Sequence, residues 1–450
     1  MASGSMFSGG DFLPLVKEQY EALPYPPRDP LRERERLIQR ASDNLITLNH
    51  HCFGGRKDFR DGFRALVAGG GTGDSTIYLA EQLRGFDAEI VHLDLSVAAM
   101  SIAQERARIR GLSDIRWVNA SIMGLPGLGL GEFDYINCTG VLHHLESSEA
   151  GLAALRDVLR PDGVILLMLY GRYGRRSVYD MQALLREHLP ADTGIAEKIR
   201  MTRALLAALP ETNSFRRDQG RWDYEISATG FGDAGLYDLL LHSQDRCFDV
   251  PDLYALAGAA GLDILCFVDR AAAYRPETYL GAAAGASALL QGLDMQRRQA
   301  IAEILTGDLI AHEFYLGRQD LHQPASFDND RNALSLAGAM HGHHREIGAS
   351  LAAGRKLTIT GRSGVLHMAG NPLNSALFAN MDAVTPLAQV YERVRANVPD
   401  FLPDKVRAAV QEICRALHDQ GHLYLLEAGA YGVKVPNYTR LPPPPLPGVK

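Results

Sequence analysis

A glycine-rich turn constrains the fold of this chain more than any other feature. The apolar run RALVAG leads directly into a turn that contains Gly69, Gly70, Gly71 and Gly73. Glycine loses more backbone freedom on folding than any other residue, so this density indicates a need for positive φ or for bare backbone close to a ligand. The segment DSTIYLAEQLR that follows has the apolar spacing of an amphipathic helix. A strand, a glycine turn and a helix in this order predict a ligand held at the helix N-terminus of an α/β sheet.

Further strands and helices alternate through residue 170. AEIVHLDLS, DIRWVNA, EFDYINCTG and GVILLMLY read as strands, and VAAMSIAQERARIRG and AGLAALRDVLR read as helices. Strands separated by helices of this length imply parallel βαβ units with right-handed crossovers. The sequence therefore predicts a doubly wound α/β sheet with helices on both faces.

The spacing of the glycines bears on which ligand the turn holds. Gly69, Gly71 and Gly73 form G-x-G-x-G instead of the dinucleotide spacing G-x-G-x-x-G, and Asp74 follows where a phosphate would need N–H groups. A carboxylate there repels an anion but not a sulfonium or ammonium, which favours S-adenosylmethionine. Asp94 ends the second strand, about 20 residues after the glycine turn. This is the spacing at which a carboxylate bonds the ribose hydroxyls in nucleotide-binding folds. The alternative role for Asp94 is an N-cap, for which Ser96 is the better candidate.

Residues 64–170 resemble the catalytic core of the class I, Rossmann-like seven-stranded S-adenosylmethionine-dependent methyltransferases. The glycine turn, Asp94, NASIMGLP and FDYINCTGVLHHL match that family's motifs in order. The resemblance implies S-adenosyl-L-methionine as cofactor and S-adenosyl-L-homocysteine as product. It implies cofactor contacts at Gly69, Gly70, Gly71, Gly73, Asp74, Asp94, Leu95, Ser121, Ile122, Cys138 and Thr139.

The chain departs from the family pattern at two places. Val67 stands where the family usually has an acidic residue that helps to bind the methionine ammonium, so Asp74 or a carbonyl would have to substitute. Ser121 stands where the family often has Asp beside the adenine, and a hydroxyl bonds adenine with less charge assistance.

Candidate catalytic residues flank the fourth and fifth strands. His143 and His144 in VLHHLE are candidate bases, although one of them could equally pack on the cofactor. Tyr170 follows the fifth strand, where substrates enter an open α/β sheet. In QYEALPYPPRDP, Tyr20 and Tyr25 would close over the cofactor and contact the sulfonium with their ring faces, or else anchor an N-terminal helix.

The expected acceptor pocket lies in a helical insertion at residues 175–260. The candidate acceptor-binding residues are Arg172, His242, Asp245 and Arg246, for which a surface salt bridge is the commoner role. Asn137-Cys138-Thr139-Gly140 replaces the Asn/Asp-Pro-Pro-Tyr motif of methyltransferases that act on planar nitrogens, so those substrates are disfavoured.

The chain is long enough for more than one domain. We expect an N-terminal helical lid at 1–60, whose opening MASGS looks like an expression remnant, and the methyltransferase domain at 61–280. A smaller α+β accessory domain follows at 281–440, with a hairpin at 355–370, two helices and a strand that together resemble a winged helix. Its shape loosely resembles bacterial methyltransferase regulatory domains, and we expect it to serve substrate recognition or homodimer contact. The tail at 441–450 is proline-rich.

Composition limits the partners. The net charge of −7 and the absence of a basic block disfavour nucleic acid, and no apolar run is long enough to span a membrane. The five cysteines are dispersed and form no CxxC pair, which is typical of reduced thiols in the cytoplasm. His341, His343 and His344 lack ligand spacing, so no metal is expected.

The expected function is therefore methyl transfer to a small molecule or to a peptide or protein side chain. Two alternatives stay open: a regulatory protein that binds S-adenosylmethionine or S-adenosylhomocysteine, and a nicotinamide-dependent oxidoreductase on a related fold.

Overall fold

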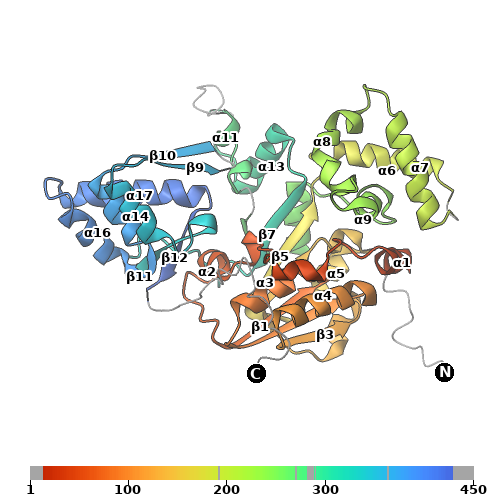
Figure 1. Cartoon of the computed structure of the whole chain (residues 1–450), viewed down its shortest axis with the longest axis horizontal. Helices are drawn as coiled ribbons and strands as arrows, with labels where there is room; N and C mark the ends of the chain where they lie inside the picture. The colour runs from red at the N-terminus through yellow and green to blue at the C-terminus, as the bar shows by residue number, and fades with distance from the viewer. Residues whose placement is uncertain are drawn as a thin grey trace, which may run out of the picture.

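The computed structural model describes residues 14–190, 193–268, 271–280, 288, 290–361 and 364–428. The opening residues MASGS and the proline-rich tail lie outside the described residues. The described chain forms a central sheet domain, a helical insertion beside the carboxyl ends of its strands, and a C-terminal α+β module on the opposite side (Figure 1). Within this part of the chain, no helix is long and apolar enough to cross a membrane.

The central sheet has seven strands in the order β3-β2-β1-β4-β5-β7-β6. The strands β1 to β5 are parallel, whereas β7 is antiparallel to both β5 and β6. Their bounds are β1 Asp61–Ala68, β2 Asp87–Asp94, β3 Ile115–Asn119, β4 Phe133–Thr139, β5 Leu159–Tyr170, β6 Asp263–Phe267 and β7 Ala311–Gly317. The strand order reverses between β1 and β4, and the carboxyl edge there is where ligands bind in open α/β sheets.

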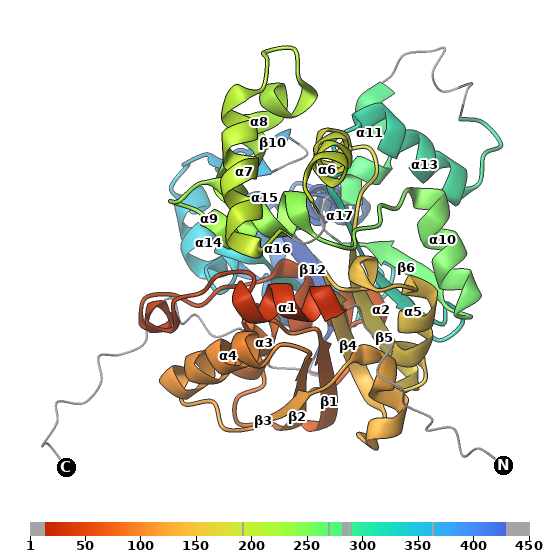
Figure 2. The ribbon, with the colours of Figure 1, turned by 90° about the vertical axis from the view of Figure 1, so that its right-hand side faces the viewer.

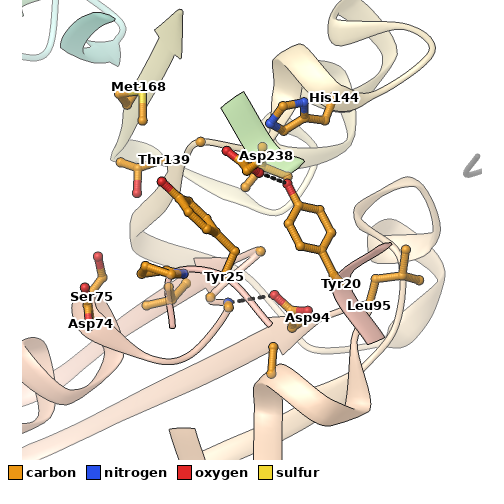
Figure 3. A pocket seen from close by; sticks show the side chains of 18 of the residues that line it. Tyr20, Tyr25, Asp74, Ser75, Asp94, Leu95, Thr139, His144, Met168 and Asp238 are labelled. Atoms are coloured by element: carbon orange, nitrogen blue, oxygen red, sulfur yellow. Dashed lines mark hydrogen bonds between the residues drawn. The ribbon is translucent and has the colours of Figure 1, made fainter. Parts of the chain in front are cut away.

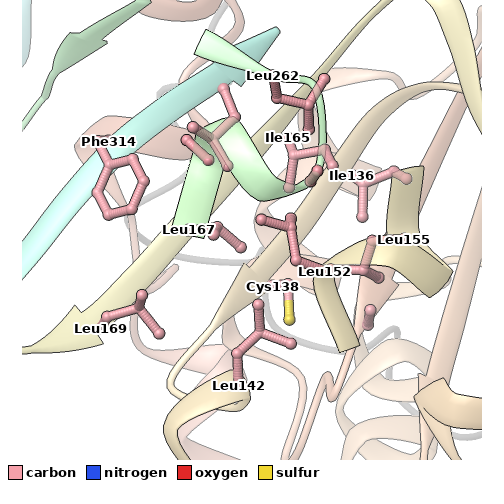
Figure 4. Packing of buried hydrophobic residues seen from close by; sticks show 14 of the residues in the cluster. Ile136, Cys138, Leu142, Leu152, Leu155, Ile165, Leu167, Leu169, Leu262 and Phe314 are labelled. Carbon is pink, nitrogen blue, oxygen red and sulfur yellow. The ribbon is translucent and has the colours of Figure 1, made fainter. Parts of the chain in front are cut away.

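Alternate residues of the strands face two separate cores, as the period of two in a strand requires. On β1, Leu66 and Ala68 pack in one core, while Ala65 and Val67 pack in the other. Figure 4 shows the first core, where side chains of β4 and β5 meet Leu152 and Leu155 of α5 and Leu262. The flanking helices are α2 Leu45–Cys52, α3 Asp74–Gln82 and α4 Val97–Arg110 on one face, and α5 Ser148–Arg156, α10 Val250–Ala259 and α13 Met295–Thr306 on the other.

The helical insertion between β5 and β6 has its own apolar core, which includes Phe215, Trp222 and Leu236. It stands above α1 Pro14–Ala22 at the sheet's carboxyl edge (Figure 2). Its elements are α6 Arg176–His188, α7 Ile195–Ala208, α8 Ser214–Ile226, α9 Gly232–Leu236 and the π-helical turn η5 Tyr237–Leu241.

The boundary between the sheet domain and the C-terminal module lies after β7, not near residue 280. Residues 296–320 read as helical in sequence, but α13 ends at Thr306 and Ala311–Gly317 forms a strand of the central sheet. The reason is tertiary: β7 inserts between β5 and β6, so its alternating residues Phe314 and Tyr315 are both buried, one in each core.

The C-terminal module combines the sheet β11-β8-β12 with the hairpin β9-β10. The predicted hairpin, two helices and final strand are present, but the final strand β12 pairs with β8 and not with the hairpin. The bounds are β8 Asn332–Leu336, α14 His344–Ala352, β9 Leu357–Gly361, β10 Gly364–Met368, α15 Pro372–Ala379, β11 Asp382–Pro386, α16 Leu387–Ala396, α17 Pro403–Asp419 and β12 Leu423–Glu427. The module meets the sheet domain where α2 contacts β12 and the Glu427 N–H donates to the Gly55 carbonyl.

Candidate active site

The glycine turn follows β1 in the backbone conformation that its sequence predicts. Gly69, Gly71 and Gly73 have φ values of +74°, +53° and +97°. A Cβ on Gly69 would lie 2.4 Å from Val141, and one on Gly71 would lie 2.9 Å from the carbonyl oxygen of Tyr25. Both the dihedral angles and the close packing therefore exclude side chains here.

Asp94 ends β2 and faces this turn. One of its carboxylate oxygens accepts the Gly71 N–H at 2.7 Å, and the other accepts the Ser96 N–H, also at 2.7 Å. Burial raises the pKa of the Asp94 carboxyl, while these amide bonds oppose the rise. Ser96 is the N-cap of α4, accepting the Ala99 N–H. Each Asp94 oxygen keeps a lone pair with which a ribose hydroxyl could bond.

The segment from α1 to Arg28 covers the turn. Thr72 donates its hydroxyl to the carbonyl of Pro26, and Ser96 donates its hydroxyl to the carbonyl of Tyr20. Glu21 accepts the N–H groups of Val97 and Ala98 at the start of α4, where the helix dipole favours a negative charge. The N-terminal segment is thus held at several points over the carboxyl edge of β1 and β2.

A cavity of about 440 Å³ runs under this cover, a size typical of small-molecule sites. Figure 3 shows Tyr20, Tyr25 and Asp238 projecting into it above Asp94. The lining residues from the covering segment to the end of β4 include Tyr20, Tyr25, Gly69, Gly70, Gly71, Asp74, Asp94, Leu95, Ser121, Ile122 and Thr139, which we call the cofactor half. The lining residues after β4 include Val141, His144, Met168, Tyr170, Arg175, Trp222, Glu225, Phe231 and Asp238, which we call the acceptor half or far half. The bare glycine backbone, the Asp94 carboxylate and the volume of the cavity fit an adenosine joined to a methionine.

The wall beside Val67 contains a carboxylate that the sequence did not reveal. Val67 pairs with Asn137 on β4, and the Asn137 amide donates to Asp43 at 2.6 Å. Asp43 is fully buried, accepts the Tyr135 hydroxyl at 2.7 Å, and lies 3.6 Å from Arg40. Asp43 is thus a carboxylate hydrogen-bonded to this part of the wall, but Asn137, and not Asp43, lines the cavity.

Asp74 is not free to replace that acid. Arg28 binds it through two nitrogens, the closer at 2.6 Å, and Arg106 binds it at 2.8 Å. Although burial raises its pKa, the Arg28 hydrogen bond and the Arg106 charge hold the pKa of Asp74 below its usual range. The carboxylate therefore ties the covering segment to α4.

A cluster of histidines and tyrosines closes the far half of the cavity. His144 approaches the Gln244 carbonyl with Nδ1 at 2.7 Å, so Nδ1 carries the proton and the buried Nε2 keeps a lone pair. His242 accepts the Gln244 N–H with Nδ1, so its Nε2–H faces the Tyr20 hydroxyl, which in turn donates to Asp238. Burial lowers the pKa of His242 well below its usual range, so this ring is neutral at physiological pH.

His144, Asp238 and His242 also lie close enough together to hold a metal ion, with ligand atoms within 4.8 Å of one another. Coordination through Nε2 of His242 would require that nitrogen to lose its proton, yet the Gln244 N–H occupies the other ring nitrogen. The hydrogen bonds therefore favour a proton-bearing network over a metal centre. Among the residues the structure describes, no metal-ligand group includes His341, His343 or His344.

Comparison with known proteins agrees with this geometry. A family model for the methyltransferase domain matches residues 66–165, which run from β1 into β5 and include the glycine turn and Asp94. Residues 66–165 therefore match a methyltransferase domain, and the sheet around them has the fold expected of the class I enzymes. The matched family model is that of a methyltransferase and not that of a nicotinamide-dependent oxidoreductase.

The alignments with individual relatives include only part of each relative's length. This chain is 34% identical over 273 residues to an uncharacterized protein of Synechococcus, covering 60% of this chain and 63% of that protein. It is 28% identical over 155 residues to the ubiquinone/menaquinone biosynthesis C-methyltransferase UbiE of Shewanella oneidensis, covering 32% of this chain and 61% of that one. The chain thus spans less than two thirds of these relatives.

A solved structure has a similar fold over most of the chain. PKMT2 from Rickettsia typhi superposes with a TM-score of 0.62 at 16% identity, covering 87% of this chain and 76% of that one. A second structure of that protein holds S-adenosylhomocysteine, with a TM-score of 0.61. At this identity the likeness concerns the fold alone.

Several residues expected at the site of the methyltransferase domain lie outside the cavity. Cys138 is fully buried in the sheet core, because its side chain points to the face of β4 opposite Asn137. Gly73 packs against Ala103 of α4, and His143 is buried against Tyr170, with ring centroids 3.9 Å apart. His242 lies behind Tyr20 and His144, stacked on the latter at 3.7 Å.

The charged candidates for acceptor binding also point away from it. Arg172 pairs with Asp249 and Asp252, and Arg246 pairs with Glu149, all as partly exposed ion pairs. Asp245 is buried behind Arg175. Sequence reasoning missed six lining residues in or just before the insertion, which are Arg175, Trp222, Glu225, Phe231, Asp238 and Leu239. Only the density of aromatic residues in RWDYE could have pointed to part of this set.

Proposed function

We propose that this protein transfers a methyl group from S-adenosylmethionine to an acceptor that enters between the covering segment and the helical insertion. The single observation that supports it best is one continuous cavity that is lined by both Asp94 and His144, whose buried Nε2 has no hydrogen-bond partner among the described residues. Methyl transfer from a sulfonium is an in-line displacement, so a cavity that holds both reactants in line supplies much of the catalysis.

The residues of the cofactor half take distinct roles in this proposal. Asp94 holds the ribose, Ser121 and Ile122 contact the adenine, and Thr139 lies along the methionine portion. Tyr20 and Tyr25 place aromatic faces over the cofactor, where they stabilise a sulfonium. When bound, S-adenosylmethionine supplies the electrophilic methyl group.

The acceptor is a small molecule or a side chain of a peptide or protein. UbiE proteins are named as C-methyltransferases, and the one from Shewanella oneidensis matches 32% of this chain. Arg175, Trp222 and Phe231 come from the insertion and from the residues just before it, so much of the acceptor half lies outside the matched family region, whereas His144 lies within it.

A second candidate is a regulatory protein that binds S-adenosylmethionine or S-adenosylhomocysteine without turnover. The observation that favours it is Val67, which leaves no carboxylate in direct contact with the methionine ammonium at that position of the cavity wall.

Calorimetry and a transfer assay separate these functions. We expect S-adenosylhomocysteine to bind and NAD not to bind, and labelled S-adenosylmethionine to pass its methyl group to a component of a cell extract. Binding without transfer would favour the regulatory role, and absence of binding would refute both.

A further inference from the structure

The far half of the cavity combines aromatic faces with two acidic side chains. Trp222 and Glu225 come from α8, and Asp238 comes from η5. Tyr25 and Tyr170 project from the covering segment and from the end of β5, and Phe231 stands against Tyr25 with ring centroids 5.6 Å apart. Aromatic rings arranged around carboxylates attract cations, both through the ring faces and through charge.

The two carboxylates contact hydroxyl groups instead of cations. Asp238 accepts the hydroxyls of Tyr20 at 3.0 Å and Tyr170 at 3.3 Å, and Glu225 accepts the Tyr25 hydroxyl at 2.9 Å. Over the described ranges, neither carboxylate forms an ion pair.

The two nearby guanidiniums already have carboxylates of their own. Arg28, which lies 5.3 Å from the centroid of the Phe231 ring, binds Asp74. Arg175 lies 3.5 Å from the fully buried Asp245 and stacks 3.6 Å over the Tyr170 ring. Burial raises the pKa of both Asp238 and Glu225, so a cation that enters beside them would stabilise their charged forms. Because both arginines are already paired with other carboxylates, Asp238 and Glu225 leave an acidic excess at this end of the cavity.

An independent observation marks this end as a ligand position. The His144 side chain is 95% buried, it lines the cavity, and its Nε2 has no hydrogen-bond partner in the described part of the chain. Since the Gln244 carbonyl holds the proton on Nδ1, Nε2 presents a lone pair. A buried lone pair without a partner is costly unless a ligand donates to it.

We propose that the acceptor is an aliphatic amine, which enters as an ammonium between Asp238, Glu225 and the aromatic rings. This inference rests on the proposed function. Nε2 of His144 takes one proton from the ammonium, which frees the nitrogen lone pair. That pair forms the new N–C bond to the methyl group as the C–S bond breaks, and the bond pair stays on sulfur in S-adenosylhomocysteine.

Binding of a simple amine tests the proposal without knowledge of the natural acceptor. We would titrate n-butylamine and, separately, n-butanol into protein saturated with S-adenosylhomocysteine, whose sulfur is neutral. We expect butylamine to bind at least about tenfold more tightly than butanol, since a charged hydrogen bond is the stronger one. Asp238→Asn and Glu225→Gln, which keep an oxygen for each tyrosine hydroxyl, should remove that preference.

A matched control is Asp233→Asn, an exposed carboxylate of α9 that pairs with Arg203 and should leave amine binding unchanged. Equal binding of butylamine and butanol, or binding of neither, would overturn the proposal. So would variants that keep amine binding but lose a preference for S-adenosylmethionine over S-adenosylhomocysteine, because the carboxylates would then serve the cofactor's sulfonium. Failure of wild-type protein to bind S-adenosylhomocysteine would instead refute the proposed function itself.

Discussion

The Asp94 carboxylate and the Gly71 backbone N–H lie 2.7 Å apart, and this hydrogen bond joins the end of β2 to the turn after β1. The same carboxylate accepts the N–H of Ser96, the N-cap residue of α4. One acidic side chain thereby orders the backbone on both sides of the proposed ribose position, before any ligand is bound.

Replacing Asp94 tests that position. Asp94→Ala should weaken S-adenosylhomocysteine binding by about 1–3 kcal/mol, because ribose hydroxyls and two backbone amides lose their acceptor. Calorimetry measures the change. Asp87→Ala, at the exposed opposite end of the same strand, should leave the affinity unaltered. Equal affinities for the wild-type and Asp94→Ala proteins would show that the ribose lies elsewhere.

Gly71 tests how the cover depends on the turn. Gly71→Ala combines a left-handed φ with a Cβ 2.9 Å from the Tyr25 carbonyl, so it should displace the covering segment and weaken S-adenosylhomocysteine binding. Gly85→Ala has a similarly positive φ of +82° with open space around the Cβ. Both variants should lose about 1–2 kcal/mol of stability from the backbone, but only Gly71→Ala should also speed proteolysis near Tyr25. Identical proteolysis of the two variants would contradict this account.

Arg106 tests the anchoring of the covering segment. Its guanidinium is almost fully buried and binds Glu33, Asp74 and the Thr72 carbonyl. Removing one partner from a buried ionic group costs about 3–5 kcal/mol, so Arg106→Ala should lower the free energy of unfolding by that amount. Arg108→Ala, on the same helix but in an exposed pair with Glu105, should have no measurable effect in urea unfolding. Similar losses for both arginines would refute the assignment.

His92 should make stability depend on pH. The ring is fully buried beneath Gly70, and burial lowers its pKa to about 3. The unfolded chain binds a proton near pH 6.5 and the folded protein does not, so this part of the stability is present above pH 6.5. It is lost as the pH falls from about 6.5 toward 3, by up to about 1.4 kcal/mol per pH unit.

The measurement compares urea unfolding at pH 7 and pH 5 in wild-type protein and in His92→Phe. The aromatic variant should lose less stability over this interval, whereas replacing the exposed His188 should not change the difference. The same pH dependence in His92→Phe and wild-type protein would show that His92 does not titrate between the two states.

The sequence predicted those parts of the fold that local pattern controls. The glycine turn, the parallel strands and the Ser96 cap follow from backbone conformation and apolar period, which neighbouring residues largely determine. The strand Ala311–Gly317 was missed because its neighbours β5 and β6 are distant in sequence, and only their pairing makes it a strand.

The acceptor half of the candidate site was less visible for a related reason. Asp238 lies in GDAGLYDLLL, where an acid among leucines is typical of an ordinary amphipathic helix, and only the tertiary fold brings it to Tyr20. Arg172 and Arg246 were predicted to bind the acceptor because of their positions along the chain, yet each forms a partly exposed ion pair with a carboxylate outside the cavity. Spacing in the sequence carries no information about such competing partners.

The covering segment has a consequence for the order of events in a catalytic cycle. Its contacts with Thr72, Ser96 and the first turn of α4 involve the same backbone that surrounds the nucleoside position. If S-adenosylhomocysteine left past the covering segment, several of these hydrogen bonds would have to break together. Its departure past the insertion would not require this. The turnover rate would then depend on how often the covering segment opens. A shortened chain that lacks this segment would exchange its nucleoside faster and bind it less tightly.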